Sequence, residues 1–502
     1  MAHETPDAAS RAACGVGARD ALGAAAGALV LVGLAAYLML HFAAPQSALT
    51  WSYAHLDRAP WRVACAALGV LMLPPLVAVL WRLPPGRRAL SNRLSRQTIA
   101  LAAVALAAWV AIGGALPAPA SNFDALVMVR AMEGERDVAR WTNTQWLFRH
   151  LVALARPYLD ARSVLVLLDS LAAGLGLLGI AAAVRELVTT RAEAIALFAL
   201  VATSFGVLQI AVGYVDIYPV ALFFTGMWLA LALRTIRRGL HPVFPAMLLG
   251  AAPFFYIGLV LLWPSALAIA WAEVRRADAA SHRRARARLG VAAAGAIGTA
   301  ALSTLPAYGR IAAWRDFLAD ASRDSAANAG LQLGTNLLPL DVLFSAQHAL
   351  EVLHGLLLVD ALGPLFLLGP GLWVCARTPL RDWRRWDPRA LLLCLLVAPS
   401  LLYSTVMDPV YGPYADWDLW SFGAGLSALL GGWAFIVWGR AHARVFPLLL
   451  GLALAASTTH LLARLHAIPF ERDQHMRESP VHLLPEADRA EAARRNAGAR
   501  AR

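Results

Sequence analysis

Residues 163–184 read SVLVLLDSLAAGLGLLGIAAAV, and this stretch decides the fold class. An α-helix of about 20 residues is about 30 Å long, which is the thickness of the hydrocarbon core of a bilayer. One carboxylate, that of Asp169, interrupts the apolar residues and is followed by Ser170. We expect this pair to form hydrogen bonds between packed helices rather than to line a transport path. The stretch therefore predicts a membrane-spanning helix.

Apolar runs of similar length recur along the chain. Hydrophobic residues make up 59% of the sequence and charged residues 15%, whereas soluble domains carry about 25% charged residues. A water-soluble core could not bury so much apolar surface, so we predict an all-α, polytopic integral membrane protein with about 12–13 transmembrane helices. The runs lie near 21–42, 62–81, 98–116, 163–184, 193–212, 219–234, 243–272, 290–307, 352–376, 390–407, 421–438 and 445–463.

Arginine carries the strong positive charge of the chain, because the sequence contains no lysine. In a soluble protein a net charge of +12 would suggest binding to nucleic acid. Here the arginines stand in short connections between apolar runs, so membrane topology explains them better and we expect no nucleic-acid partner. The positive-inside rule places five such connections in the cytoplasm: 82–96, 234–238, 275–288, 377–389 and 440–444.

The run 243–272 tests this topology. If it crossed once, the connections 234–238 and 275–288 would lie on opposite sides of the membrane, against the positive-inside rule. Pro253 and the segment Tyr256–Gly258 are suited to break the run into two short helices or a re-entrant pair. We therefore expect about 13 crossings with the N-terminus in the cytoplasm.

This topology divides the chain into a short N-terminal tail (1–20), a transmembrane domain (21–463) and a polar C-terminal tail (464–502). The long loops 117–162 and 308–350 then face outward. Because the cytoplasmic connections are short, any extended substrate-handling surface must be extracytoplasmic. We expect a multi-pass protein of a bacterial inner membrane.

Two outward carboxylates stand close to apolar runs. Asp124 opens the first long loop in the motif Asn122-Phe123-Asp124, where a lipid-linked substrate would present its headgroup. Asp216 lies with Tyr214 in the tight turn Gly213–Pro219. A carboxylate at the bilayer boundary is costly and is kept mainly for pairing, transport or catalysis. For the tight turn, an aromatic belt with a helix-capping aspartate is the structural alternative.

Three further groups are candidates for binding. Asp416 and Asp418 could bind a divalent cation such as Mg²⁺ or Mn²⁺, although Asp418 would also serve as a helix N-cap. Arg140 and Trp141 suit phosphate binding and sugar stacking, or an amphipathic surface helix. His348 is a candidate ligand, but a structural hydrogen bond is the more common role of a lone histidine. No zinc-ligand spacing, nucleophile elbow or phosphate loop occurs, so nucleotide hydrolysis and serine-hydrolase chemistry are not expected.

The acidic motifs together resemble the C-type polytopic membrane glycosyltransferases, the GT-C superfamily. The residues that carry the resemblance are Asn122–Asp124, Gly213–Asp216, Ser345–His348 and Asp416–Asp418. The resemblance implies a hexosyl- or pentosyltransferase whose donor is a polyprenyl-phosphate sugar, with Asp124 as the catalytic base or metal ligand. Three apolar runs precede the first long loop here, where the family often has one.

Under this interpretation the site has three parts. Asp124 is catalytic, the pair Asp416 and Asp418 is the metal site, and the residues that bind substrate are Arg140, Trp141, Tyr214, Asp216 and His348. The partners are the lipid-linked donor and membrane lipid. The alternatives are a transporter or lipid flippase, which would place polar residues at mid-membrane depth, and a non-catalytic scaffold subunit.

Overall fold

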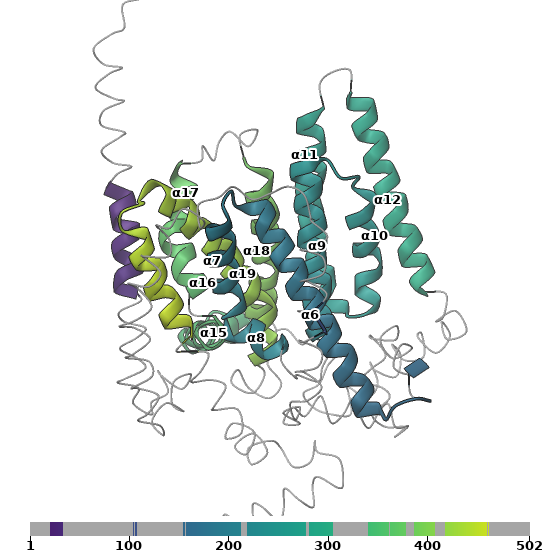
Figure 1. Cartoon of the computed structure of the whole chain (residues 1–502), viewed down its shortest axis with the longest axis horizontal. Helices are drawn as coiled ribbons and strands as arrows, with labels where there is room; N and C mark the ends of the chain where they lie inside the picture. Colours follow the sequence, from purple (N-terminus) through teal and green to yellow (C-terminus); the bar gives the residue numbers. More distant parts are fainter. Residues whose placement is uncertain are drawn as a thin grey trace, which may run out of the picture.

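The computed structural model describes a bundle of helices (Figure 1). All regular elements among its described residues are helical, which confirms the predicted all-α class. The described residues are 21–33, 104, 106–107, 154–155, 157–211, 218–277, 281–304, 340–360, 362–377, 386–406, 417–458 and 460.

Within the described residues the helices overlap the predicted apolar runs, but the run 193–212 is divided into two helices, α7 and α8, at residues 203–204. Their bounds are Ala21–Gly33, α6 Ala161–Leu187, α7 Arg191–Ala202, α8 Phe205–Ala211, α9 Tyr218–Arg238, α10 Val243–Ala251, η5 Ala252–Phe254, η6 Ile257–Ser265, α11 Ala266–Arg276, α12 His282–Thr304, α14 Leu340–Leu343, α15 Ala346–Val359, α16 Leu362–Phe366, η8 Leu367–Gly371, α17 Leu372–Arg377, α18 Pro388–Val406, α19 Trp417–Ala441 and Phe446–Thr458.

Several of these helices have the length and composition of membrane spans. Four qualify singly within the described part of the chain, at Ser163–Leu187, Tyr218–Arg238, Gly258–Arg276 and Pro388–Val406, and a fifth if a bent pair is one span. Large apolar side chains also remain on the surface, such as Ile297 at 70% exposure. Such side chains are stable in contact with lipid, so the chain is a multi-pass membrane protein. The full count of about 12–13 crossings stays a prediction.

Four of the five predicted arginine-rich connections meet at one end of the bundle, which we call the arginine end. The fifth, 82–96, lies outside the described residues. The contacts that join the four connections and the adjoining helix ends are Arg237 to the carbonyl of Glu186 (3.0 Å), Arg276 to the carbonyl of Ile236, Arg275 to the carbonyl of Trp386 (2.7 Å), Trp373 to His442 (5.6 Å between rings) and Arg440 to Glu193 (2.7 Å). The topology argument therefore grouped these connections correctly.

Buried glutamates hold the arginine end together. Glu186, Glu193 and Glu273 are each at least nine-tenths buried. Each binds an arginine of another helix, with shortest N···O distances of 2.6 Å for Glu186–Arg238, 2.7 Å for Glu193–Arg440 and 2.9 Å for Glu273–Arg288. Removing one partner of such a buried pair leaves an uncompensated charge, which costs about 3–5 kcal/mol. These three contacts, which we call the glutamate clamps, join α6 to α9, α7 to α19 and α11 to α12.

The run 243–272 turns back inside the bundle. This return brings the basic connections on either side of it, 234–238 and 275–288, to the same end. Helix α10 leaves the arginine end at Val243, and the chain returns through η6 and α11 to the same end at Arg276. Pro253 lies in the short 3-10 helix η5 where α10 ends. The indole N–H of Trp263 donates to the carbonyl of Leu249 at 3.3 Å, so the two arms pack side by side. The position of the predicted break is confirmed.

The run 352–376 differs from the single crossing that we predicted. It is broken, and the two arms Ala346–Leu357 and Leu362–Arg377 form an angle of 101°. Asp360 lies at the break with extended backbone, and the following helix begins at Leu362 and carries Gly363-Pro364 in its first turn. In an unbroken helix the ring of Pro364 would clash with the carbonyl oxygen of Asp360, so the first arm cannot continue. In the first turn of α16 Pro364 is tolerated, because its missing N–H needs no partner there.

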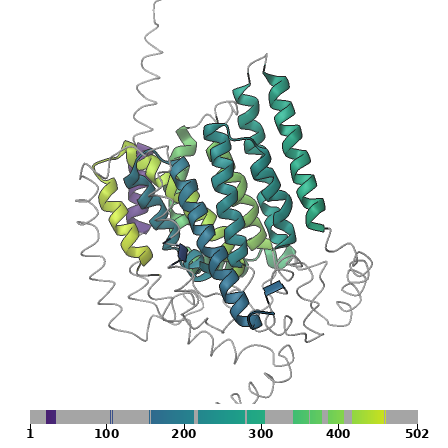
Figure 2. The ribbon, with the colours of Figure 1, turned by 45° about the vertical axis from the view of Figure 1, so that its right-hand side comes forward.

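The other end of the bundle, which we call the tyrosine end, holds Tyr218, Tyr256, His348 and Thr405. It contains the start of α9 and the end of α18, which are the ends opposite the arginines of these helices. Figure 1 shows α8 and α15 beside it. Figure 2 shows the same bundle turned by 45° about the vertical axis. The predicted outward turn before Tyr218 and the segment after Val406 both adjoin this end.

Helices α6 and α9 pack along much of their length through glycine. A Cβ built on Gly176 would lie 2.7 Å from the carbonyl oxygen of Leu222, which is closer than real Cβ atoms approach. Gly226 on α9 meets the backbone of Gly176 in the same way. Small residues let two membrane helices approach closely, so this contact positions α9.

Cysteine labelling tests the shared arginine end. In a background without the four native cysteines, Ser281→Cys and Arg444→Cys should react with a membrane-impermeant maleimide from the same side of the membrane. Tyr158→Cys, at the start of α6, should react from the opposite side, because α6 runs from the tyrosine end to the arginine end. Labelling of Ser281→Cys and Arg444→Cys from opposite sides would contradict the fold.

A glycine substitution tests the packing of α6 on α9. Gly176→Leu should lower stability by about 1–3 kcal/mol, the usual cost of overpacking, because backbone atoms leave no room for the new side chain. Gly298→Leu on α12 is the matched control, since nothing lies within 4 Å of a Cβ there. Thermal unfolding of both purified variants in detergent gives the comparison. Equal melting temperatures would rule out close α6–α9 packing.

Candidate functional site

The short helix α8 organises the tyrosine end. It packs against α6, α9, α15 and α19. A Cβ built on Gly206 would lie 3.0 Å from the Ser421 hydroxyl and 3.2 Å from the Val359 side chain, so α8 fits closely between α15 and α19. The acidic turn 212–217 follows α8 directly in the chain. The segments predicted to face outward therefore adjoin one compact group of helix ends.

Two tyrosines mark the start of α9. The ring of Tyr218 lies 5.8 Å from that of Tyr256, at the break between η5 and η6. Phe224, within α9, packs against Phe255 at 4.9 Å. Pro219 suits the first turn of α9, because it lacks an N–H that would otherwise need a partner. These aromatic contacts fix the beginning of α9, and with it the position at which the turn 212–217 ends.

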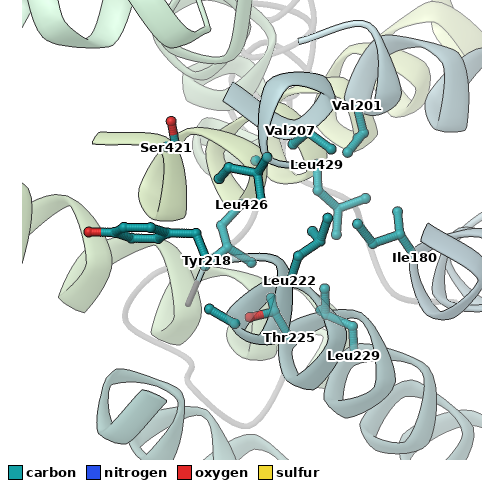
Figure 3. Close-up of a pocket in the computed structure, with 13 residues that line it drawn as sticks. Ile180, Val201, Val207, Tyr218, Leu222, Thr225, Leu229, Ser421, Leu426 and Leu429 are labelled. Atoms are coloured by element: carbon teal, nitrogen blue, oxygen red, sulfur yellow. The ribbon is translucent and has the colours of Figure 1, made fainter. Parts of the chain in front are cut away.

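A narrow apolar crevice opens beside Tyr218 (Figure 3). Its cavity volume is about 30 Å³, which is about the volume that one water molecule occupies in the liquid. Aliphatic side chains of α6, α7, α8, α9 and α19 form most of its wall, and Figure 3 shows Tyr218 and Ser421 on the same side of it. The crevice therefore brings the beginnings of α9 and α19 together.

One hydroxyl in this wall is unusual. Thr225 is 6% exposed, and its Oγ1 has no hydrogen-bond partner among the described residues. Leaving a buried hydroxyl without a partner costs about 1–3 kcal/mol. A water molecule or a polar ligand atom in the crevice would recover this energy, so Thr225 marks a position suited to a polar group.

Asp360 is a buried carboxylate at the break between α15 and α16. It is 4% exposed, and its Oδ2 accepts hydrogen bonds from the backbone N–H of Gly363 at 3.1 Å and the Ser427 hydroxyl at 3.3 Å. The first contact caps α16, and the second ties the break to α19. Asp360 was not among the residues that we predicted, although a carboxylate within an apolar run, followed by Gly363-Pro364, was a visible signal.

His348 has the surroundings of a structural residue. It lies in the first turn of α15, is 4% exposed, and its Nε2 is 2.7 Å from the carbonyl oxygen of Thr405 on α18. Since a carbonyl accepts, Nε2 carries the proton. Its Nδ1 is 3.6 Å from Glu351. These contacts join α15 to the end of α18, and they leave the predicted contact with substrate as a hypothesis.

Most of the predicted site residues fall outside the described residues. Asp418 is the second residue of α19, and of its side chain nothing is described. Outside the described ranges lie Asp124, Arg140, Trp141, Tyr214, Asp216 and Asp416. The described part of the chain holds no group of three or more His, Cys, Asp or Glu suited to a metal ion. The metal site at Asp416 and Asp418 therefore stays a prediction.

The structure adds three residues near the predicted ones. In the sequence, Tyr218 follows the acidic turn 212–217 and Ser421 follows a second acidic turn, 408–416, and both side chains line the crevice. Thr225 lies about two helical turns farther along α9. Tyr218 was visible in the sequence as part of the turn Gly213–Pro219. Ser421 and Thr225 gave no signal, because hydroxyl residues are common within membrane helices.

Comparisons with known proteins give no match. No protein-family model matches the chain. No curated protein and no solved structure is similar to it at a significant level. Function is therefore argued from the arrangement of the chain's own residues.

Proposed function

We propose that this protein is a membrane glycosyltransferase that uses a polyprenyl-phosphate sugar at the tyrosine end. One observation carries the proposal: Tyr218 and Ser421 line the same crevice, and each follows an acidic turn. Asp216 stands two residues before Tyr218, and Asp418 three residues before Ser421. Two residues of chain span at most about 7 Å, and the proposal therefore puts Asp216 at the rim of the crevice.

This arrangement suits sugar transfer from a phosphate-linked donor. The acceptor hydroxyl needs a base to take its proton, whereas the departing phosphate is a weak base and needs no acid. In the proposal Asp124 is that base, as the GT-C resemblance implies, and Asp216 assists in holding the substrate. A divalent cation at Asp416 and Asp418, or the guanidinium of Arg140, would balance the phosphate charge.

The membrane setting supports a lipid-linked donor. The crevice is too narrow for a prenyl chain, so the proposal places the sugar and phosphate at its rim and the chain in the surrounding lipid. Trp141 and Tyr214 would stack on the sugar, and His348 would support the rim through Thr405. The substrate then meets carboxylates without its lipid leaving the bilayer.

Asparagine substitutions test this function. Asp124→Asn, Asp216→Asn and Asp418→Asn should each abolish or strongly reduce one cell-surface glycan when they replace the wild-type protein in its native host. Each change removes a charge and keeps the shape of the side chain. Loss of the catalytic base alone lowers such rates by about 10²–10⁴-fold. Glycan profiling at equal membrane abundance is the measurement.

Asp387→Asn is the matched control. Asp387 lies at the arginine end, where its carboxylate binds Arg389 at 2.6 Å on a part-exposed surface, so its loss should leave the glycan unchanged. A normal glycan profile in all three variants would exclude these carboxylates from the mechanism. No glycan change in a deletion strain would remove the glycosyltransferase proposal itself.

A transporter or flippase is the second candidate, and Asp360 favours it. Broken helices with a buried polar residue at the break form the binding sites of many secondary transporters. Here the break at Asp360 packs on Ser427 of α19. Its hydrogen bonds also have a structural purpose, because the bond from Gly363 caps α16 and the bond from Ser427 ties the break to α19. The glycosyltransferase therefore remains the leading proposal.

Asp360→Asn separates the two candidates. Asparagine keeps an oxygen that can accept from Gly363 and Ser427, so the fold should survive while the ionisable group is lost. We expect a normal melting temperature in detergent and a normal glycan profile. If Asp360→Asn instead keeps a normal melting temperature but loses function completely, and Asp216→Asn leaves the glycan profile unchanged, ion-coupled transport is favoured.

A further inference from the structure

A second cavity lies at the arginine end, between the ends of α9, α11 and α12. Its volume is about 170 Å³, much larger than that of the crevice. The residues that line it are Gly239, Glu273, Arg276, Ala277, Ser281, Arg284, Ala285 and Arg288. Three arginines and one glutamate thus surround a space large enough for a phosphate group, and among the described lining residues two of the positive charges have no counter-charge.

Two of the arginines are held in place by protein contacts. Arg276 and Arg288 bind the buried carboxylate of Glu273 at 3.2 and 2.9 Å. Arg288 also donates to the carbonyl oxygens of Gly239 and Leu240 at 3.1 and 3.0 Å, where α9 ends. Because these contacts hold the guanidinium groups before any ligand arrives, a ligand would not have to order them.

The third arginine lacks such contacts. Arg284 is exposed, and it forms no ion pair or hydrogen bond with any residue that the structure describes. It belongs to the first turn of α12, which also contains His282 and Arg283 and has no acidic residue. The N-terminus of a helix carries partial positive charge, which disfavours cations and favours an anion. Among the described residues this turn therefore carries positive charge without an acidic side chain of its own, which favours the binding of an anion.

The position of the cavity suits the phosphate group of a lipid. Figures 1 and 2 show the arginine-bearing ends of α11 and α12 extending beyond the neighbouring helices. Farther along α12 and on α10, apolar side chains are exposed, among them Val291 at 52% and Phe244 at 52%. Arginine forms paired hydrogen bonds with phosphate oxygens. Basic pockets between membrane helices recognise anionic headgroups by this chemistry.

We propose that the cavity between α9, α11 and α12 binds a phosphate group through Arg276, Arg284 and Arg288. Glu273 positions two of the arginines, and Arg284 closes on the bound anion. The phosphate can belong to a membrane lipid or to a soluble molecule, since the same oxygens are recognised. The cavity lies at the opposite end from the proposed catalytic site, so this inference does not depend on the glycosyltransferase proposal.

Binding of phosphatidic acid to the purified full chain tests the proposal. The lipid is titrated in neutral detergent micelles, with phosphatidylcholine as the uncharged reference and inorganic phosphate as the competitor. Arg284→Gln should weaken binding about tenfold, because one charge-assisted contact is lost. Arg284→Lys should give an intermediate affinity, because the charge remains while the paired geometry is lost.

Arg283→Gln is the matched control, since Arg283 is exposed in the same helical turn and does not line the cavity. It should change affinity by less than about twofold. Competition by inorganic phosphate would show that the phosphate group alone is recognised, and saturable binding without competition would identify the lipid as the ligand. Equal weakening by Arg283→Gln and Arg284→Gln, or no saturable binding, would overturn the proposal. All variants should keep the wild-type melting temperature, because neither side chain supports a helix contact.

Discussion

The guanidinium group of arginine cannot remain in hydrocarbon, and the arrangement of the helices follows from this constraint. The chain has no lysine, so each basic connection must bring arginine to a membrane surface. Four such connections share one end of the bundle. The return of the chain at Pro253 satisfies the same constraint, because a straight helix would have carried the arginines at 275–288 to the wrong end. At that end Glu186, Glu193 and Glu273 each bind an arginine of another helix, and these ion pairs join the helices.

The two ends of the bundle differ in how they are held. At the arginine end, helices are joined by buried ion pairs with several hydrogen bonds each. At the tyrosine end, the described contacts between helices are ring packing and single hydrogen bonds, such as Tyr218 on Tyr256 and His348 to Thr405. Breaking such contacts costs less free energy than breaking a buried ion pair. Substrate entry between α9 and α19 would therefore leave the arginine end intact.

Much of the fold could be predicted from the sequence because its causes are local. Length and hydropathy predict a spanning helix, and the distribution of arginine predicts which connections lie together. The glutamate clamps could not be predicted, since Glu193 and Arg440 are 247 residues apart and nothing local pairs them. Asp360 was missed because a single carboxylate within an apolar run also fits a polar packing contact. For the site, the acidic turns stay predictions, because Asp124, Asp216 and Asp416 lie outside the described residues. Thr225 and Ser421 became visible only through their shared crevice.

The clamp between Glu193 and Arg440 also has a consequence for biosynthesis. The ribosome adds about 5–20 residues per second, and the partners are separated by 247 residues; Glu193 therefore waits for roughly 12–50 seconds before Arg440 is made. During that interval a carboxylate that ends up buried has no arginine, and α7 cannot take its final place beside α19. Helix insertion and helix packing are thus separate stages in this protein. The contact between α7 and α19 can form only after α19 has been made, and a chain that stops before α19 would leave Glu193 without the charge of Arg440.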